Sequence, residues 1–203
     1  MGFFNRLLGV DLSMTLCALR DVDLESNRRT EHSGQQDTRE ALYEEVSVRL
    51  GSAHRWREVG PSLISAIDDL FVEHHPELID PFVPDYLACL RSRGCSVSLT
   101  SNTAFVPGIT IRRVLDILGL GDRFDFLLFS DEVGVGKPNP EFMCKVFGHR
   151  NCHACVTSEV LHLGDNEATD GEGARLAGYQ FELFDPRQGF CWRRLQREIV
   201  NAT

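Results

Sequence analysis

The chain has 203 residues, of which 42% are apolar and 25% are charged, and its formal net charge is −9. This length is enough for one well-packed core, with or without a small insertion. No apolar run approaches the ~20 residues of a membrane-spanning helix, and the acidic balance disfavours broad binding to nucleic acid or to an anionic membrane. We therefore expect a globular protein that binds neither, although a local metal or cation would still let it bind a small anion.

The first residues and the cysteines bear on where the protein works. Arg6 followed by apolar residues is superficially like a signal peptide, but Asp11 interrupts the apolar stretch. The seven cysteines are an odd number without framework spacing, which favours reduced thiols over a disulfide scaffold. Both observations favour a cytoplasmic location.

Short apolar segments alternate with segments of helical period along most of the chain. Helices are expected from Pro84 to Gly94 and over residues 111–118. Strands are expected at residues 7–10, 97–99, 124–129, 160–163 and 179–184. This alternation predicts an α/β fold, with a parallel sheet between two layers of helices in a three-layer, Rossmann-like α/β/α core.

Residues 18 to 80 behave differently, because they contain no convincing strand. The polar stretch from Glu25 to Asp37 favours a loop. We therefore predict a core domain made of residues 1–17 and 81–203, with a helical cap over residues 18–80. Apolar residues at helical spacing place two helices in that cap: Leu42, Val46 and Leu50 share one face, and Ile64, Ile67 and Phe71 share another.

Four polar motifs lie at or near the carboxyl ends of predicted strands. In open α/β sheets this edge is where ligands bind. In chain order the motifs are Asp11-Leu-Ser13-Met-Thr15, Ser101-Asn102, Gly136-Lys137-Pro138, and Gly164-Asp165 with Asp170. Each motif alone is compatible with turn or capping chemistry, but four in this order indicate one site.

This set of motifs resembles the haloacid dehalogenase-like superfamily, whose members are mostly phosphatases. The resemblance covers nearly the whole chain outside the insertion. It implies that Asp11 is the nucleophile and forms an aspartyl-phosphate, which splits one difficult displacement into two easier ones. It also implies that Ser13 and Thr15 belong to the catalytic motif.

The resemblance further implies a magnesium ion and a phosphate cradle. Mg²⁺ takes one or two carboxylates together with waters and a phosphate oxygen. The implied metal ligands are the carboxylates of Asp11, Asp165 and Asp170 and the carbonyl of Ser13. The implied phosphate donors are the Ser101 hydroxyl, the Asn102 backbone N–H and the Lys137 ammonium group, which would also stabilise the transition state.

Ser13 departs from the family pattern, in which a second aspartate two residues after the nucleophile acts as general acid and base. A hydroxyl cannot replace that carboxylate near pH 7 without a neighbouring base, and the lost assistance is worth ~10²–10⁴-fold. Three explanations stay open: an easy leaving group, another residue or water in that role, or slow turnover. A mutase role is disfavoured, and the absence of lysine from residues 18–80 excludes Schiff-base chemistry in the cap.

The leading hypothesis is therefore hydrolysis of a small phosphorylated metabolite, a phosphate monoester, with Mg²⁺ as cofactor. A metal-independent carbon–halogen hydrolase and a non-catalytic binding or regulatory protein remain as alternatives. The oligomeric state is left open. Seven arginines of the cap are available to bind a second anionic group on the substrate: Arg20, Arg28, Arg29, Arg39, Arg49, Arg55 and Arg57.

Overall fold

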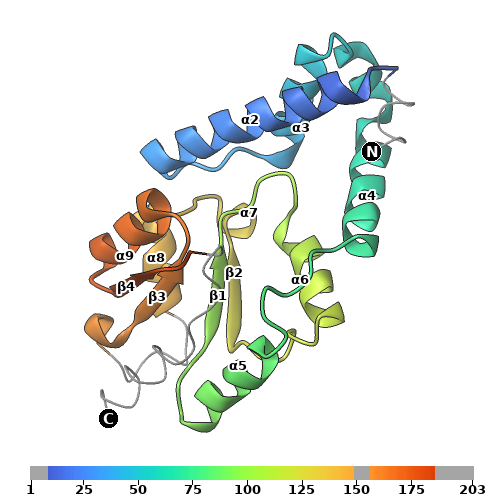
Figure 1. Cartoon of the computed structure of the whole chain (residues 1–203). Coiled ribbons are helices and arrows are strands. Elements are labelled where there is room, and N and C mark those ends of the chain that lie inside the picture. Colours follow the sequence, from blue (N-terminus) through green and yellow to red (C-terminus); the bar gives the residue numbers. More distant parts are fainter. Residues whose placement is uncertain (1–8, 149–155, 186–203) are drawn as a thin grey trace.

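The computed structural model describes residues 9–148 and 156–185 (Figure 1). Four short parallel strands lie at the centre, and helices surround them. Helices α2 (Leu12–Ser33) and α3 (Arg39–Arg49) lie above the strands in the view of Figure 1, whereas α4 (Ala53–Glu73) descends at one side, next to α6 (Gly108–Ile117). Within the described ranges, no helix is both long enough and apolar enough to cross a membrane.

The α2 helix runs without a break from Leu12 to Ser33 and so crosses the predicted boundary between core and cap at residues 17 and 18. Its buried stripe consists of small side chains at helical spacing: Thr15, Ala18, Val22, Ser26 and Thr30. Gly34 ends the helix in the left-handed region, with a φ of 65°, and its N–H donates to the carbonyl of Thr30. The loop predicted over residues 25–37 is therefore wrong for residues 25–33.

Polar residues in α2 satisfy their hydrogen bonds locally, which explains why the loop prediction failed. The Ser26 hydroxyl donates to Asp37 over 2.8 Å, and Arg29 forms an ion pair with the same carboxylate at 2.8 Å. The Thr30 hydroxyl donates to the carbonyl of Gln35. These contacts hold the segment after α2 against the helix, so a polar composition here does not mean irregular structure.

Two apolar clusters pack the helices of residues 12–73 together, and Phe105 packs against both. Helices α3 (Arg39–Arg49) and α4 (Ala53–Glu73) confirm the two helices predicted from periodicity. Tyr43, Trp56 and Leu63 pack together, and the Tyr43 and Trp56 rings stack with centroids 5.6 Å apart. A second cluster joins α2 to α3 through Ala18, Val22, Leu42 and Val46.

The four strands form two parallel pairs. The first pair consists of β1 (Ser98–Ser101) and β2 (Phe126–Phe129), and the second of β3 (Leu161–Gly164) and β4 (Gln180–Leu183). These confirm four of the five predicted strands. Of the predicted first strand, residues 7 and 8 lie outside the described ranges, while Val10 is not in a strand. In the described part of the chain, no strand joins β1 to β3.

Two apolar clusters pack helices against the strands. One joins β2 to α8 (Pro140–Phe147) and α9 (Glu172–Ala177), around Phe142 and Met143, which are fully buried. The other surrounds Phe129 and joins it to α5 (Val83–Ser92) and α6 (Gly108–Ile117). The remaining short elements are α7 (Ser130–Val133), the 3₁₀ turn η2 (Thr157–Glu159) and the π-helical turn η3 (Glu167–Gly171).

Candidate active site

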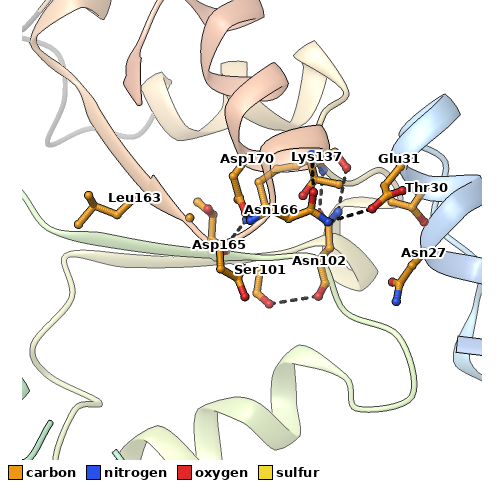
Figure 2. A pocket seen from close by; sticks show the side chains of 13 residues that line it. Asn27, Thr30, Glu31, Ser101, Asn102, Lys137, Leu163, Asp165, Asn166 and Asp170 are labelled. Atoms are coloured by element: carbon orange, nitrogen blue, oxygen red, sulfur yellow. Dashed lines mark hydrogen bonds and ion pairs between the residues drawn. The ribbon is translucent and has the colours of Figure 1, made fainter. Parts of the chain in front are cut away.

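A polar pocket of about 340 Å³ opens where the carboxyl ends of β1 and β3 meet the C-terminal half of α2 (Figure 2). Its volume suits a small metabolite. The pocket brings together five residues that the sequence predicted for phosphate or metal binding: Ser101, Asn102, Lys137, Asp165 and Asp170. They come from three separate segments of the chain, so the fold assembles them.

Lys137 and Asp170 form a buried ion pair at the base of this pocket. The Lys137 Nζ lies 2.6 Å from Asp170 Oδ1, and the two side chains are only 8% and 6% exposed. The ammonium group also donates to the Thr100 carbonyl over 3.3 Å. These contacts hold the lysine at the carboxyl end of β1 with a fixed direction.

A second partner of Asp170 is His162, whose Nε2 lies 2.9 Å from the same oxygen. The other oxygen, Oδ2, accepts from the backbone N–H of Asn166 over 3.2 Å. Burial by itself raises the pKa of Asp170, but the His162 hydrogen bond and the Lys137 charge outweigh it and lower the pKa to about 2. Asp170 is thus ionised at neutral pH, and both of its oxygens are already engaged.

Asn102 fixes the loop that carries Lys137. Its side-chain amide donates to the Lys137 carbonyl over 2.8 Å and accepts from the Lys137 backbone N–H over 2.7 Å. A Cβ at Gly136 would lie 2.6 Å from Asn102 Oδ1, so only glycine allows this close approach. The Ser101 hydroxyl donates to the Asn102 carbonyl over 3.1 Å and lies at the pocket wall.

Gly164 and Asp165 follow β3 into the pocket. A Cβ at Gly164 would lie 2.2 Å from the Asp170 Cγ, which explains the glycine before Asp165. The Asp165 residue is exposed, in contrast to Asp170, and no hydrogen bond occupies its carboxylate within the described residues. Asp165 is therefore the carboxylate most available to a ligand at this edge.

The α2 helix supplies the opposite wall through Asn27, Thr30 and Glu31, which share one helix face. Glu31 Oε1 accepts from the Asn166 side-chain amide over 2.9 Å. Figure 2 shows this bond between the helix and the turn after β3. None of the seven cap arginines lines the pocket.

Asp11, Ser13 and Thr15 do not line this pocket. Asp11 is the N-cap of α2, where its Oδ1 accepts from the backbone N–H of Ser13 over 2.8 Å and from the Ser13 hydroxyl. The Ser13 hydrogen bonds lower the pKa of Asp11. Thr15 is buried, and its hydroxyl donates to the Asp11 carbonyl over 2.9 Å. In this arrangement Asp11, Ser13 and Thr15 form the hydrogen bonds at the N-terminus of α2.

A family model described as haloacid dehalogenase-like hydrolase matches residues 16–178. The chain belongs to the haloacid dehalogenase-like hydrolase family. The matched segment includes every pocket residue named above, whereas Asp11, Ser13 and Thr15 precede it.

Relatives and solved structures agree with this assignment. The chain is 32% identical over 142 residues to a phosphoserine phosphatase from Thermus thermophilus, covering 69% of this chain and 51% of the relative. It is 28% identical to a phosphoglycolate phosphatase from Yersinia pseudotuberculosis, covering 66% and 58%. The chain thus spans about half the length of the curated relatives it matches.

The fold matches that of a putative HAD-hydrolase, YfnB from Bacillus subtilis, with a TM-score of 0.64, 21% identity, and coverage of 85% of this chain and 72% of that one. A 2-haloacid dehalogenase from Pseudomonas syringae gives a TM-score of 0.55, 21% identity, and coverage of 89% and 72%. The predicted Rossmann-like α/β core is confirmed.

The carboxylates of the pocket are too few to hold a magnesium ion by themselves. They suit an ion whose remaining ligands are water and phosphate oxygens. Mg²⁺ commonly uses one or two carboxylates and completes its shell with water and phosphate oxygens. Asp165 offers a free carboxylate, whereas Asp170 is engaged by Lys137 and His162. No group of three or more His, Cys, Asp or Glu side chains that could hold a metal ion occurs among the described residues.

Several residues of this site were missed by the sequence analysis. His162 lies two positions before Gly164 on β3, so strand alternation would have placed it on the same face. Asn166 lies one residue after Asp165 and caps η3. Asn27 and Glu31 show helical spacing, but they fell in the segment assigned to a loop.

Proposed function

We propose that this protein hydrolyses a phosphate monoester of a small metabolite, with Mg²⁺ as cofactor, at the pocket between β1, β3 and α2. The observation that carries the proposal is the convergence of Ser101, Lys137 and Asp165 on one small pocket at the carboxyl ends of two parallel strands. The family membership supports it, as do the names of the relatives, which are phosphoserine and phosphoglycolate phosphatases.

In this proposal Lys137 and Ser101 bind the phosphoryl oxygens. The Lys137 ammonium group donates to Asp170 and Thr100, so its direction is set before the substrate arrives. The Ser101 hydroxyl exchanges its bond to the Asn102 carbonyl for one to phosphate. Asn102 acts indirectly, because its side chain holds the backbone of Lys137.

Asp165 would hold Mg²⁺ together with the phosphate. The ion supplies positive charge that offsets the repulsion between the phosphate and the carboxylates of the pocket. Asp170 contributes by orienting Lys137, since its two oxygens are occupied by protein donors.

Attack by Asp11 stays a prediction, and the arrangement of α2 does not favour it. Sixteen residues separate Asp11 from Asn27, the first pocket residue on that helix, which corresponds to ~24 Å along the helix axis. Asp11 would reach a bound phosphoryl group only if α2 adopted another position. The consequence predicted for Ser13, slow hydrolysis of the aspartyl-phosphate, depends on the same rearrangement.

A panel of phosphate monoesters, assayed with Mg²⁺ and with chelator, tests the proposal. We expect Mg²⁺-dependent release of phosphate, and a loss of at least about tenfold in Asp165→Asn relative to wild type. Asp21→Asn, which removes an exposed carboxylate of α2 outside the pocket, is the matched control. Undiminished activity in chelator would contradict the role of Mg²⁺.

A second candidate is a protein that binds phosphate esters without turnover, and the position of Asp11 outside the pocket favours it. Asp11→Asn separates the two readings, because asparagine caps a helix about as well as aspartate. Loss of turnover at an unchanged melting temperature would identify Asp11 as the nucleophile. Ester binding without any turnover in the wild type would establish the binding protein.

A further inference from the structure

Glu31 presents a carboxylate to the pocket from the cap side, opposite the residues proposed to bind phosphate. Its Oε1 accepts from the Asn166 amide over 2.9 Å. Asn166 is itself held in place, since its own side-chain oxygen accepts from the backbone N–H groups of Ala168 and Thr169. Glu31 is therefore oriented by a fixed partner, and no hydrogen bond occupies its second oxygen in the described part of the chain.

The charges in the pocket leave Glu31 without a cation. Among the lining residues, Lys137 is the one positively charged side chain, and its partner is Asp170. Asp165 is the carboxylate proposed for Mg²⁺. Within residues 9–148 and 156–185, Glu31 forms no ion pair, whereas Glu25 and Glu45 of the same cap each pair with Arg49.

This pattern disfavours a substrate with a second anionic group at the cap side. The sequence analysis offered the cap arginines for such a group, but none of them lines the pocket, and Glu31 stands there instead. A carboxylate held near Glu31 would be repelled, whereas an ammonium group would form a charge-assisted hydrogen bond. Asn27, one turn earlier on α2, adds a side-chain carbonyl that can accept from the same group.

We propose that Glu31 is a specificity residue that binds a primary ammonium group, so that the preferred substrates are phosphate monoesters of amino alcohols. The inference rests on the proposed phosphate site, and it names the class of substrate for that site. The phosphate binds at Lys137 and Ser101, and the ammonium group binds at the free oxygen of Glu31.

Binding by calorimetry in the presence of Mg²⁺ tests this without requiring turnover. The probes are O-phosphoethanolamine, which carries an ammonium group, ethyl phosphate, which lacks it, and phosphoglycolate, which carries a carboxylate instead. We expect wild type to prefer phosphoethanolamine over ethyl phosphate by about tenfold or more, because a hydrogen bond between an ammonium group and a carboxylate is stronger than one between neutral groups. Phosphoglycolate should bind more weakly than ethyl phosphate.

Glu31→Gln keeps the shape and the acceptor for Asn166 but removes the charge. It should abolish the preference for the ammonium ester, leave ethyl phosphate binding within about twofold, and strengthen phosphoglycolate binding. Glu44→Gln is the control, since it makes the same charge change on an exposed residue of α3 outside the pocket. It should behave as wild type with all three probes.

The outcomes separate this inference from the proposed function. If ethyl phosphate binds wild type and the ammonium ester gains nothing, or if the preference survives Glu31→Gln, the role of Glu31 is wrong and the phosphate site stands. If no probe binds wild type at all, the phosphate site itself is wrong, and the inference falls with it.

Discussion

Lys137 and Asp170 face each other across 2.6 Å at the base of the pocket, and both side chains are almost wholly buried. One follows β2 and α7, and the other lies in the π-helical turn after β3, so their contact joins the two strand pairs. Two buried charges are tolerated because each has further partners, Thr100 for the lysine and His162 for the carboxylate.

The first prediction concerns this ion pair. Lys137→Met should lower the free energy of unfolding by about 3–5 kcal/mol, because it leaves Asp170 as a buried carboxylate without its main cation. The double variant Lys137→Met/Asp170→Asn should recover much of that stability, since the uncompensated charge is gone. Urea unfolding of wild type, both single variants and the double variant measures the coupling.

Phosphate binding is a second measurement on the same four proteins: wild type, the two single variants and the double variant. The double variant should remain unable to bind ethyl phosphate, because the ammonium donor is absent even when stability returns. Normal binding in the double variant would show that Lys137 does not hold phosphate.

The second prediction is the pH dependence of stability. Folding lowers the pKa of Asp170 to about 2 from the ordinary value of 3.8. The ionised carboxylate therefore stabilises the fold fully above about pH 4, and this contribution disappears as the pH falls from about 4 to about 2. Unfolding midpoints should be measured across that window for wild type and Asp170→Asn.

Other carboxylates titrate in the same range, so the difference between the two proteins is the informative quantity. We expect it to shrink steadily toward pH 2. A difference that does not change with pH would mean that Asp170 is not ionised in the folded protein.

The third prediction concerns Asp11 as a helix cap. Asp11→Ala should lower the melting temperature by about 2–4 °C, because it removes the acceptor for the first N–H groups of α2. Asp11→Asn should change it by much less. Circular dichroism melts of the three proteins test this, and equal melts for Asp11→Ala and wild type would contradict the capping role.

The sequence analysis predicted Ser101, Lys137 and Asp165 for one site, and the structure brings them to one pocket. The prediction used a rule that is local in the chain. A polar motif after an apolar strand lies at the carboxyl edge of the sheet, and Ser101 and Asp165 both obey this rule. Lys137 was found through its motif. The parallel strands then place the segments that carry these three residues at the same edge.

The same rule predicted Asp11 for this site, but an aspartate before a helix has two physical explanations. It can follow a strand and face a ligand, or it can cap the helix that begins at the next residue. In the structure Asp11 caps α2, which begins at Leu12. Nothing in the residues from Asp11 to Thr15 distinguishes the two, since hydroxyl groups serve both.

Glu31 and Asn27 were missed for a different reason. Their segment is polar throughout, and apolar periodicity detects a helix only where its buried face is apolar. Here the buried positions are Ser26 and Thr30, whose hydroxyls are satisfied by Asp37 and Gln35. Hydrogen bonds to residues five and eleven positions further along the chain are not visible in the apolar spacing of a sequence.

The last prediction tests the close packing of Gly164 against Asp170. Gly164→Ala would place a methyl group 2.2 Å from the Asp170 Cγ, so the carboxylate must move away from Lys137. We expect a loss of about 1–3 kcal/mol in stability, as is usual for overpacking, and at least a tenfold loss of affinity for ethyl phosphate. Gly148→Ala is the control, because its methyl group would meet the Cys144 carbonyl at an ordinary 3.4 Å. Calorimetry and urea unfolding of both variants measure the two effects. If Gly164→Ala retained wild-type affinity, the direction of Lys137 would not depend on Asp170, and the indirect role assigned to that carboxylate would be wrong.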